Sequence, residues 1–226
     1  MADDGRRALQ FSPPLPEHVV FVALDPDDDP ATRLYPSEGA TLGPRTVPKR
    51  RREFERGRAA ARMALNELGH GEPAILVGPH REPLWPDGVV GSITHAGGYA
   101  LAAVANREGC GGVGLDPEER RVFPELRAEV AHGGEVAWMQ RLAESERERT
   151  AFELFSAKEA IYKAFFPRVG HFFGFEAVEL APARGGFTAR LVELLDAQYP
   201  PTRTFDICVG WYEQLVLSSV VLESDA

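Results

Sequence analysis

Two long helix-like stretches, each followed by a group of short strand-like segments, constrain the fold of this chain more than any other feature. Residues 48–68 and 147–166 carry apolar side chains at helical spacing; Pro48 opens the first and Pro167 is expected to end the second. The segments rich in β-branched and apolar residues are 18–24, 74–77, 89–94, 99–105, 175–180, 187–191, 205–211 and 215–222. This order predicts an α+β fold of two similar units, which we place at residues 1–110 and 111–226.

The composition excludes several classes of protein. The formal net charge of −9 over 226 residues argues against a general nucleic-acid binder. No apolar run approaches the roughly 20 residues of a membrane helix, and the first residues lack the pattern of a signal peptide. Two cysteines, Cys110 and Cys208, do not make a disulfide framework. We therefore expect a cytoplasmic protein without a membrane or nucleic-acid partner.

Positive charge is concentrated around the start of the first helix-like stretch. Eight basic residues fall within eighteen positions: Arg45, Lys49, Arg50, Arg51, Arg52, Arg56, Arg58 and Arg62. A local basic patch on an acidic protein indicates one defined anionic ligand. The alternative is a solvated, charged helix face.

The segment from Gly111 to Lys163 contains the residues that carry the most chemistry. Residues 112–118 are typical of a short strand, along which Asp116 and Glu118 point to the same face. Glu159 and Lys163 lie one turn apart on the second helix-like stretch. Three carboxylates from a strand end and a helix would make an all-oxygen site for Mg²⁺, or for Mn²⁺. The alternatives are a solvated strand end and an ordinary surface ion pair.

One residue interrupts that strand pattern. Pro117 lies between the two carboxylates and has neither a free φ nor a backbone N–H. We therefore expect the strand to end at this proline, which leaves the two carboxylates at the strand end.

Three motifs carry a resemblance to a known family. They are Gly91–His95 (GSITH), Gly112–Glu118 (GVGLDPE) and Phe155–Lys163 (FSAKEAIYK), with supporting pieces at residues 49–54, 57–58 and 82–86. In this order and spacing they resemble the 4′-phosphopantetheinyl transferases of the Sfp/EntD type, over roughly residues 48–175. The resemblance implies two pseudo-symmetric α+β subdomains, with coenzyme A and Mg²⁺ in the cleft between them.

The resemblance also implies a reaction. Enzymes of this family move the phosphopantetheine arm of coenzyme A onto a serine of a carrier protein and release adenosine 3′,5′-bisphosphate. We expect the chain to act as a monomer on an apo acyl or peptidyl carrier protein. Asp116, Glu118 and Glu159 are the expected metal ligands. Glu159, Lys163 and Asp116 form the expected catalytic group, with Glu159 as the base for the serine.

Contacts with coenzyme A follow from the same resemblance. The expected binding residues are Arg50, Arg58, Arg81, Thr94, His95, Lys158 and Lys163. The two lysines would supply positive charge to the diphosphate, and the threonine and histidine would hydrogen-bond its oxygens. The arginines match positions that hold the 3′-phosphate and adenine end, although Arg81 stands where a lysine is common. From their proximity in sequence to the metal motif, residues 119–123 and Leu126 are expected to contribute to the carrier-protein dock.

Two rival functions remain open at this point. A metal-dependent hydrolase of coenzyme A or a nucleotide diphosphate would use the same carboxylates, with water in place of the serine. The chain lacks the Glu-rich R-E-x-x-E-E helix of the common diphosphate hydrolases. A noncatalytic binding module for coenzyme A or a carrier protein would not need the carboxylate set.

Overall fold

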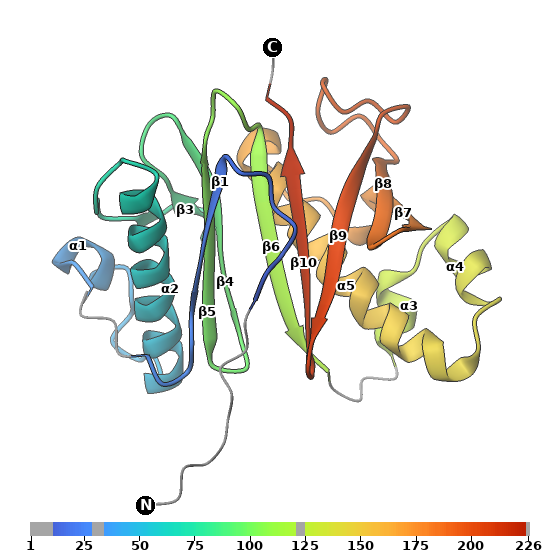
Figure 1. The fold of residues 1–226 in the computed structure, drawn as a ribbon, viewed down its shortest axis with the longest axis horizontal. Coiled ribbons are helices and arrows are strands. Elements are labelled where there is room, and N and C mark those ends of the chain that lie inside the picture. The colour runs from blue at the N-terminus through green and yellow to red at the C-terminus, as the bar shows by residue number, and fades with distance from the viewer. Residues whose placement is uncertain (1–10, 29–33, 121–124, 225–226) are drawn as a thin grey trace, which may run out of the picture.

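The computed structural model describes residues 11–28, 34–120 and 125–224. Its two larger antiparallel β-sheets each have one long helix packed against them, and Figure 1 shows these two sheets side by side. A small two-stranded sheet, β2-β3, completes the described strands. The predicted α+β fold class is confirmed. Within the described part of the chain, no helix combines the length and the apolar character that a membrane span requires.

The first sheet runs in the order β1-β5-β4 and packs against α2. The elements of this part are β1 (Val19–Leu24), α1 (Pro36–Gly39), α2 (Pro48–Glu67), β2 (Leu76–Val77), β3 (Pro83–Leu84), β4 (Val89–Ala96) and β5 (Tyr99–Asn106). Pro48 occupies the first turn of α2, as predicted, where its missing N–H is not needed. A Cβ on Gly57 would lie 2.8 Å from Cγ2 of Ile93, so this glycine lets α2 approach β4 closely.

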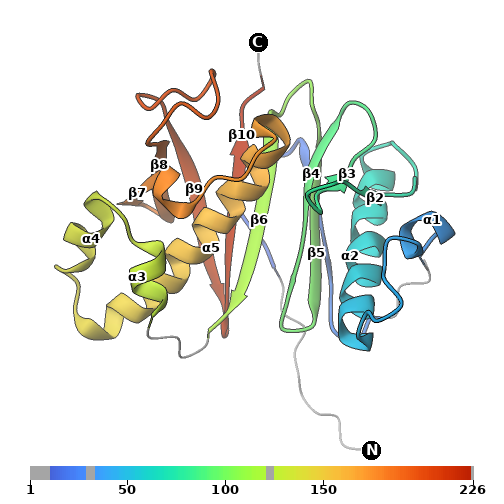
Figure 2. The same ribbon diagram turned by 180° about the vertical axis from the view of Figure 1, so that it is seen from behind.

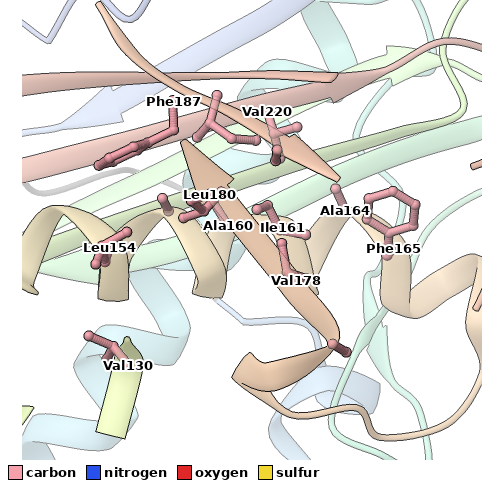
Figure 3. Close-up of a cluster of buried hydrophobic side chains, with 14 of the residues drawn as sticks. Val130, Leu154, Ala160, Ile161, Ala164, Phe165, Val178, Leu180, Phe187 and Val220 are labelled. Atoms are coloured by element: carbon pink, nitrogen blue, oxygen red, sulfur yellow. The ribbon is translucent and has the colours of Figure 1, made fainter. Parts of the chain in front are cut away.

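The second sheet runs in the order β6-β10-β9-β8-β7. The elements of this part are β6 (Gly112–Glu119), α3 (Leu126–Val130), α4 (Gly134–Met139), α5 (Glu144–Val169), the 3-10 helix η1 (Phe175–Ala177), β7 (Val178–Ala183), β8 (Gly186–Leu191), β9 (Thr204–Tyr212) and β10 (Leu215–Leu222). Helix α5 covers one face of the sheet, as the reverse view in Figure 2 shows. Figure 3 shows Ile161 of α5 among the buried side chains of Val178, Leu180 and Val220. Burial of this apolar face holds the helix to the sheet.

The two sheets meet where β4 lies beside β6, and both ribbon views show this junction (Figures 1 and 2). The strands are not hydrogen-bonded into one sheet. Across the junction, the backbone N–H of Leu115 donates to Oγ of Ser92 at 3.1 Å. The expected boundary between residues 110 and 111 falls in the connection from β5 to β6, and the division into two subdomains there stays a prediction.

Two prolines behave differently from the prediction. Strand β6 does not end at Pro117 but continues to Glu119. It is the last strand of its sheet, so a residue without an N–H is tolerated on its open side. Helix α5 likewise continues past Pro167 and ends at Gly170, whose φ of 72° is a left-handed helix cap.

The hairpin between β4 and β5 is tighter than predicted. Its turn consists of Gly97 and Gly98, with φ of 58° and 87°, and β4 extends to Ala96. His95 therefore lies within the strand, one residue beyond the predicted end at residue 94, and Thr94 lies within the strand as predicted. Because side chains alternate along a strand, they face opposite sides of the first sheet.

Candidate active site

Lys163 of α5 joins the two sheets at their junction. Its ammonium donates to Oγ1 of Thr94 at 3.0 Å, to the carbonyl of Leu115 at 3.0 Å and to Oδ1 of Asp116 at 2.6 Å. Thr94 comes from β4 and Asp116 from β6. The structure thus brings together three of the predicted site residues from distant parts of the chain.

Two glycines allow α5 to lie this close to β6. A Cβ on Gly114 would lie 1.8 Å from the carbonyl oxygen of Ala160, and one on Gly112 would lie 2.5 Å from that of Ala164. No heavier side chain fits at either position without moving the helix. The glycines of the GVGLDPE motif therefore set the distance between the carboxylate on the strand and the charged residues on the helix.

Ser156 is a site residue to which the sequence analysis assigned no role. Its hydroxyl donates to the backbone carbonyl of Asp116 at 2.6 Å, and its Oγ lies 2.8 Å from Oγ of Ser218 on β10. All three residues are buried. Ser156 thereby fixes the middle of α5 to the residue that carries the central carboxylate. Its position in the FSAKE motif was the available signal.

The carboxylate of Asp116 is enclosed, and only 4% of the residue is exposed. Within the described residues, its Oδ2 has no hydrogen-bond partner. Burial raises the pKa of Asp116 to about 7; Lys163 opposes this shift, while the negative charges of Glu118 and Glu159 add to it. A buried carboxylate with one free oxygen and two negative neighbours is a place where a cation is favoured.

Glu159 lies one turn before Lys163 and is half-buried. Burial raises its pKa, and the charge of Lys163 opposes that shift. Over the ranges that the structure describes, no three His, Cys, Asp or Glu side chains stand close enough together to hold a metal ion. Asp116 feels the charge of Glu118 and of Glu159, but the three are not arranged as a closed set of ligands. The metal assignment stays a prediction, and the oxygen donors match its chemistry.

His95 faces the other side of β4 and contacts α2. Its Nε2 lies 3.0 Å from Nη1 of Arg50 and 3.6 Å from a carboxylate oxygen of Glu53. Burial lowers the pKa of His95, with Glu53 opposing the shift. A guanidinium can only donate, so Nε2 of His95 is the acceptor in this hydrogen bond and carries no proton there; the lowered pKa agrees with that state. Arg50 and His95, two of the residues expected to bind coenzyme A, thus contact each other, and Glu53 lies beside them.

Arg58 lies about two turns beyond Arg50 on α2 and is buried. Its Nε–H donates to the carbonyl of Ile75 at 2.8 Å, and its guanidinium lies 4.4 Å from the centre of the Phe54 ring. Burial lowers its pKa to about 10, with the charge of Glu38 opposing that shift. Arg58 remains cationic at neutral pH and is held in one orientation.

A cavity of about 240 Å³ opens between the two halves of the molecule. Helix α5 lines it with Glu159, Tyr162, Lys163, Phe166 and Pro167, and the first part of the chain lines it with residues 80–83, Trp85 and residues 91–93. Arg81 is among these residues, in a turn where the N–H of Gly78 donates to the carbonyl of Glu82 and the N–H of Arg81 donates to the carbonyl of Gly78. The structure therefore places Arg81 across this cavity from the charged residues of α5.

A second cavity of about 710 Å³ lies over the β4–β5 hairpin. Its lining residues are Lys49, Arg52, Glu53, Arg56, residues 95–100 and residues 117–119. His95 and Glu118, which line this cavity, follow Thr94 and Asp116 closely along their strands. The cluster of Lys163, Thr94 and Asp116 therefore lies between the two cavities.

The expectation for Lys158 needs correction. Only 2% of this residue is exposed, and its ammonium donates to Glu135 at 2.7 Å, to the carbonyl of Val130 at 2.8 Å and to the carbonyl of Phe175 at 3.0 Å. All three N–H bonds of the ammonium are thus used inside the second half of the molecule. Because Lys158 is rotated by roughly 140° from Lys163 around the helix, it faces the core instead of the cavity.

Part of the basic cluster on α2 is also structural. Arg56 donates to the backbone carbonyls of Asp25 and Asp28, and Arg62 pairs with Glu38 in the interior. The cluster is therefore not one anion-binding face. Of the residues expected in the carrier-protein dock, 121–123 lie outside the described residues.

Comparisons with known proteins agree with these motifs. The 4′-phosphopantetheinyl transferase N-terminal domain matches residues 38–105, and the 4′-phosphopantetheinyl transferase superfamily matches residues 112–208. The 4′-phosphopantetheinyl transferase Svp of Streptomyces mobaraensis is 42% identical over 173 residues, which cover 74% of this chain and 70% of Svp. The 4′-phosphopantetheinyl transferase PptT of Mycobacterium tuberculosis is 38% identical over 203 residues, or 86% of this chain and 88% of PptT.

A third relative matches over a shorter length. Enterobactin synthase component D of Salmonella typhi is 40% identical over 126 residues, covering 54% of this chain and 50% of that protein. Together the two family models include the motifs whose side chains meet at the sheet junction: the first contains Gly91–His95, and the second contains Gly112–Glu118 and Phe155–Lys163. The chain belongs to the 4′-phosphopantetheinyl transferase superfamily and is an enzyme of that class.

Proposed function

We propose that this enzyme transfers the 4′-phosphopantetheine group of coenzyme A to a serine of an apo acyl or peptidyl carrier protein and releases adenosine 3′,5′-bisphosphate. The observation that carries the proposal is the meeting of Lys163, Thr94 and Asp116 between two cavities. A diphosphate placed at this point would extend one end of coenzyme A toward each cavity. The family membership supports the transfer itself.

The proposed metal ligands are Asp116, Glu118 and Glu159, with Mg²⁺ as the ion and Mn²⁺ as the alternative. The free Oδ2 of Asp116 and the negative charge around it support this set. When bound, the ion supplies positive charge to the oxygens of the diphosphate. Glu118 and Glu159 need to turn toward Asp116 for all three to share one ion.

The side chains around the diphosphate have separate proposed roles. Lys163 can shift from Asp116 toward a phosphate oxygen, and its bond to Thr94 keeps the ammonium at the junction. Arg50 donates to His95 in their present pair. Once a phosphate replaces that pair, the guanidinium is available as a donor, and His95 becomes one when its Nε2 takes up a proton. Arg58 and Arg81 are the proposed contacts of the 3′-phosphate and adenine end.

Glu159 is the proposed general base. Burial raises its pKa toward neutrality, which strengthens it as a proton acceptor, and it lines the cavity beside Lys163. From there it would accept the proton of the carrier serine, directly or through water. The serine oxygen then attacks the β-phosphorus, and the bond from that phosphorus to the bridging oxygen breaks.

Mass spectrometry of an apo carrier protein incubated with coenzyme A and Mg²⁺ tests the proposal. Transfer adds the phosphopantetheine mass to the carrier; free phosphopantetheine would instead support the hydrolase, and no product would support a binding module. Asp116→Ala and Glu159→Ala should each reduce transfer at least about a hundredfold, the order expected when a group that stabilises the transition state is removed. Glu148→Ala, at an exposed glutamate of the same helix, is the matched control. Near-normal turnover of either site variant would refute the assignment.

The carrier itself is a further proposal. Enterobactin synthase component D is named for a siderophore pathway, so carriers of siderophore, polyketide, peptide and fatty-acid synthesis are the candidates. Assaying such carriers side by side at one coenzyme A concentration would rank them by kcat/KM. We also propose that the enzyme acts as a monomer, since one chain supplies both sides of the junction; light scattering at working concentration tests this.

A further inference from the structure

Glu38 is a buried carboxylate outside the proposed reaction. It lies on α1 with 0% of its surface exposed. Both of its oxygens accept hydrogen bonds from Nη1 of Arg62, at 2.8 Å each, and Oε2 also accepts the backbone N–H of Tyr35 at 2.9 Å. Burying an ion pair in this way carries a large desolvation cost. A gain in the stability of the fold is therefore not a sufficient reason for the pair to be present.

A further contact of Glu38 leads toward the proposed coenzyme A site. Its Oε1 accepts the backbone N–H of Ile75 at 3.0 Å. The carbonyl of the same Ile75 accepts the Nε–H of Arg58 at 2.8 Å. Both backbone polar groups of this buried residue are therefore occupied, one by Glu38 and the other by Arg58. The position of Ile75 determines where the Nε edge of Arg58 must point.

The remaining contacts of Arg58 leave its other edge available. The Phe54 ring covers one face of the guanidinium. Among the described residues, neither terminal nitrogen of Arg58 has a hydrogen-bond partner. A guanidinium fixed along its Nε edge and on one face presents the terminal nitrogens in a constant direction, which suits bidentate binding of a phosphate.

We infer that Glu38 is a positioning residue for coenzyme A, which acts through the backbone of Ile75 to fix the orientation in which Arg58 binds the 3′-phosphate. The inference rests on the proposed function, in which Arg58 contacts that phosphate. It adds that a residue far outside the FSAKE and GVGLDPE motifs contributes to coenzyme A affinity.

The double variant Glu38→Leu/Arg62→Met tests this inference. Removing both charges together avoids an unpaired buried charge, but the N–H of Ile75 loses its acceptor. The measurements are KM and kcat with coenzyme A and with 3′-dephospho-coenzyme A, at a saturating apo carrier. We expect KM for coenzyme A to rise about fivefold to tenfold, the effect of a weakened charge-assisted hydrogen bond. KM for the dephospho compound and kcat should change less than twofold.

Two further variants separate positioning from stability. Glu38→Gln/Arg62→Met keeps a side-chain oxygen for the Ile75 N–H, so KM for coenzyme A should return toward the wild-type value. Tyr35→Phe removes the hydroxyl bond to the carbonyl of Glu72 and leaves Glu38 and Ile75 untouched, so neither KM should change. A loss of kcat with both KM values unchanged in the Leu/Met variant would show a structural role only and would overturn the inference.

Arg58→Ala distinguishes failure of the inference from failure of the proposed function. It should raise KM for coenzyme A while leaving KM for 3′-dephospho-coenzyme A unchanged. If it changes neither, or both equally, the phosphate contact of Arg58 is refuted, and the inference falls with it. If Arg58→Ala behaves as expected but Glu38→Leu/Arg62→Met does not raise KM for coenzyme A, the positioning role alone is refuted.

Discussion

Replacing Lys158 by methionine tests whether this lysine stabilises the fold or binds a phosphate of coenzyme A. The ammonium is the cationic partner of the Glu135 carboxylate, which is itself fully buried. In Lys158→Met, Glu135 keeps the backbone N–H bonds from His132 and Leu180, both at 2.8 Å, but has no positive charge beside it. Removing one partner of a buried ion pair lowers the free energy of unfolding by about 3–5 kcal/mol.

The expected loss is large enough to measure in two ways. The free energy of unfolding in urea should fall by about 3–5 kcal/mol. For a chain of this size, each kcal/mol lowers Tm by about 2–4 °C, so Tm should fall by roughly 6–20 °C. Lys158→Met/Glu135→Gln removes both charges and should recover most of the loss. Lys49→Met is a control at a lysine whose side chain is 88% exposed, and it should change stability by less than about 0.5 kcal/mol.

Kinetics decide between the two roles. At a temperature where Lys158→Met is fully folded, KM for coenzyme A should stay within about twofold of wild type, since the ammonium points into the core. An unchanged Tm together with a tenfold higher KM for coenzyme A would refute the structural assignment. That result would return Lys158 to the phosphate-binding set.

The remaining predictions concern the packing of the helices against their sheets. Gly114→Ala should destabilise the fold by about 3 kcal/mol or more and reduce transfer, because its Cβ would overlap a helix carbonyl; Gly43→Ala, with open space around it, is the control for urea unfolding. Gly57→Ala should cost less, about 1 kcal/mol, since its Cβ meets only a side-chain methyl group and alanine favours the helix. Ser156→Ala should lower stability by about 1–3 kcal/mol, because a buried carbonyl loses its donor; a thermal unfolding curve that matches wild type would contradict this.

Much of the fold follows from local sequence. The apolar spacing and Pro48 predict α2, the β-branched runs predict the strands, and the bounds differ from the structure by a few residues at most sites. The errors at Pro117 and Pro167 share a cause. Proline stops an element only where its cost is large: Pro117 lies on an edge strand, and Pro167 removes a single hydrogen bond just before the cap at Gly170.

The candidate site shows the limit of such reasoning more sharply. Motif spacing selects Asp116, Glu159 and Lys163, and the structure brings all three to the sheet junction. The same motif includes Lys158, whose neighbour Glu159 lines the cavity while Lys158 itself faces the core. One residue along a helix is a rotation of about 100°, so adjacent charged side chains serve different surfaces.

The sequence by itself determined the fold class, the family and the residue types that can bind a diphosphate, because these depend on periodicity and on motifs that are local in the chain. Tertiary structure alone decided which basic residues face a cavity. It paired Arg62 with Glu38 and Lys158 with Glu135 in the interior, and it left Lys163 at the junction. The physical reason is that the free energy of a charge depends on its burial and its partners, and both are set by residues distant in sequence.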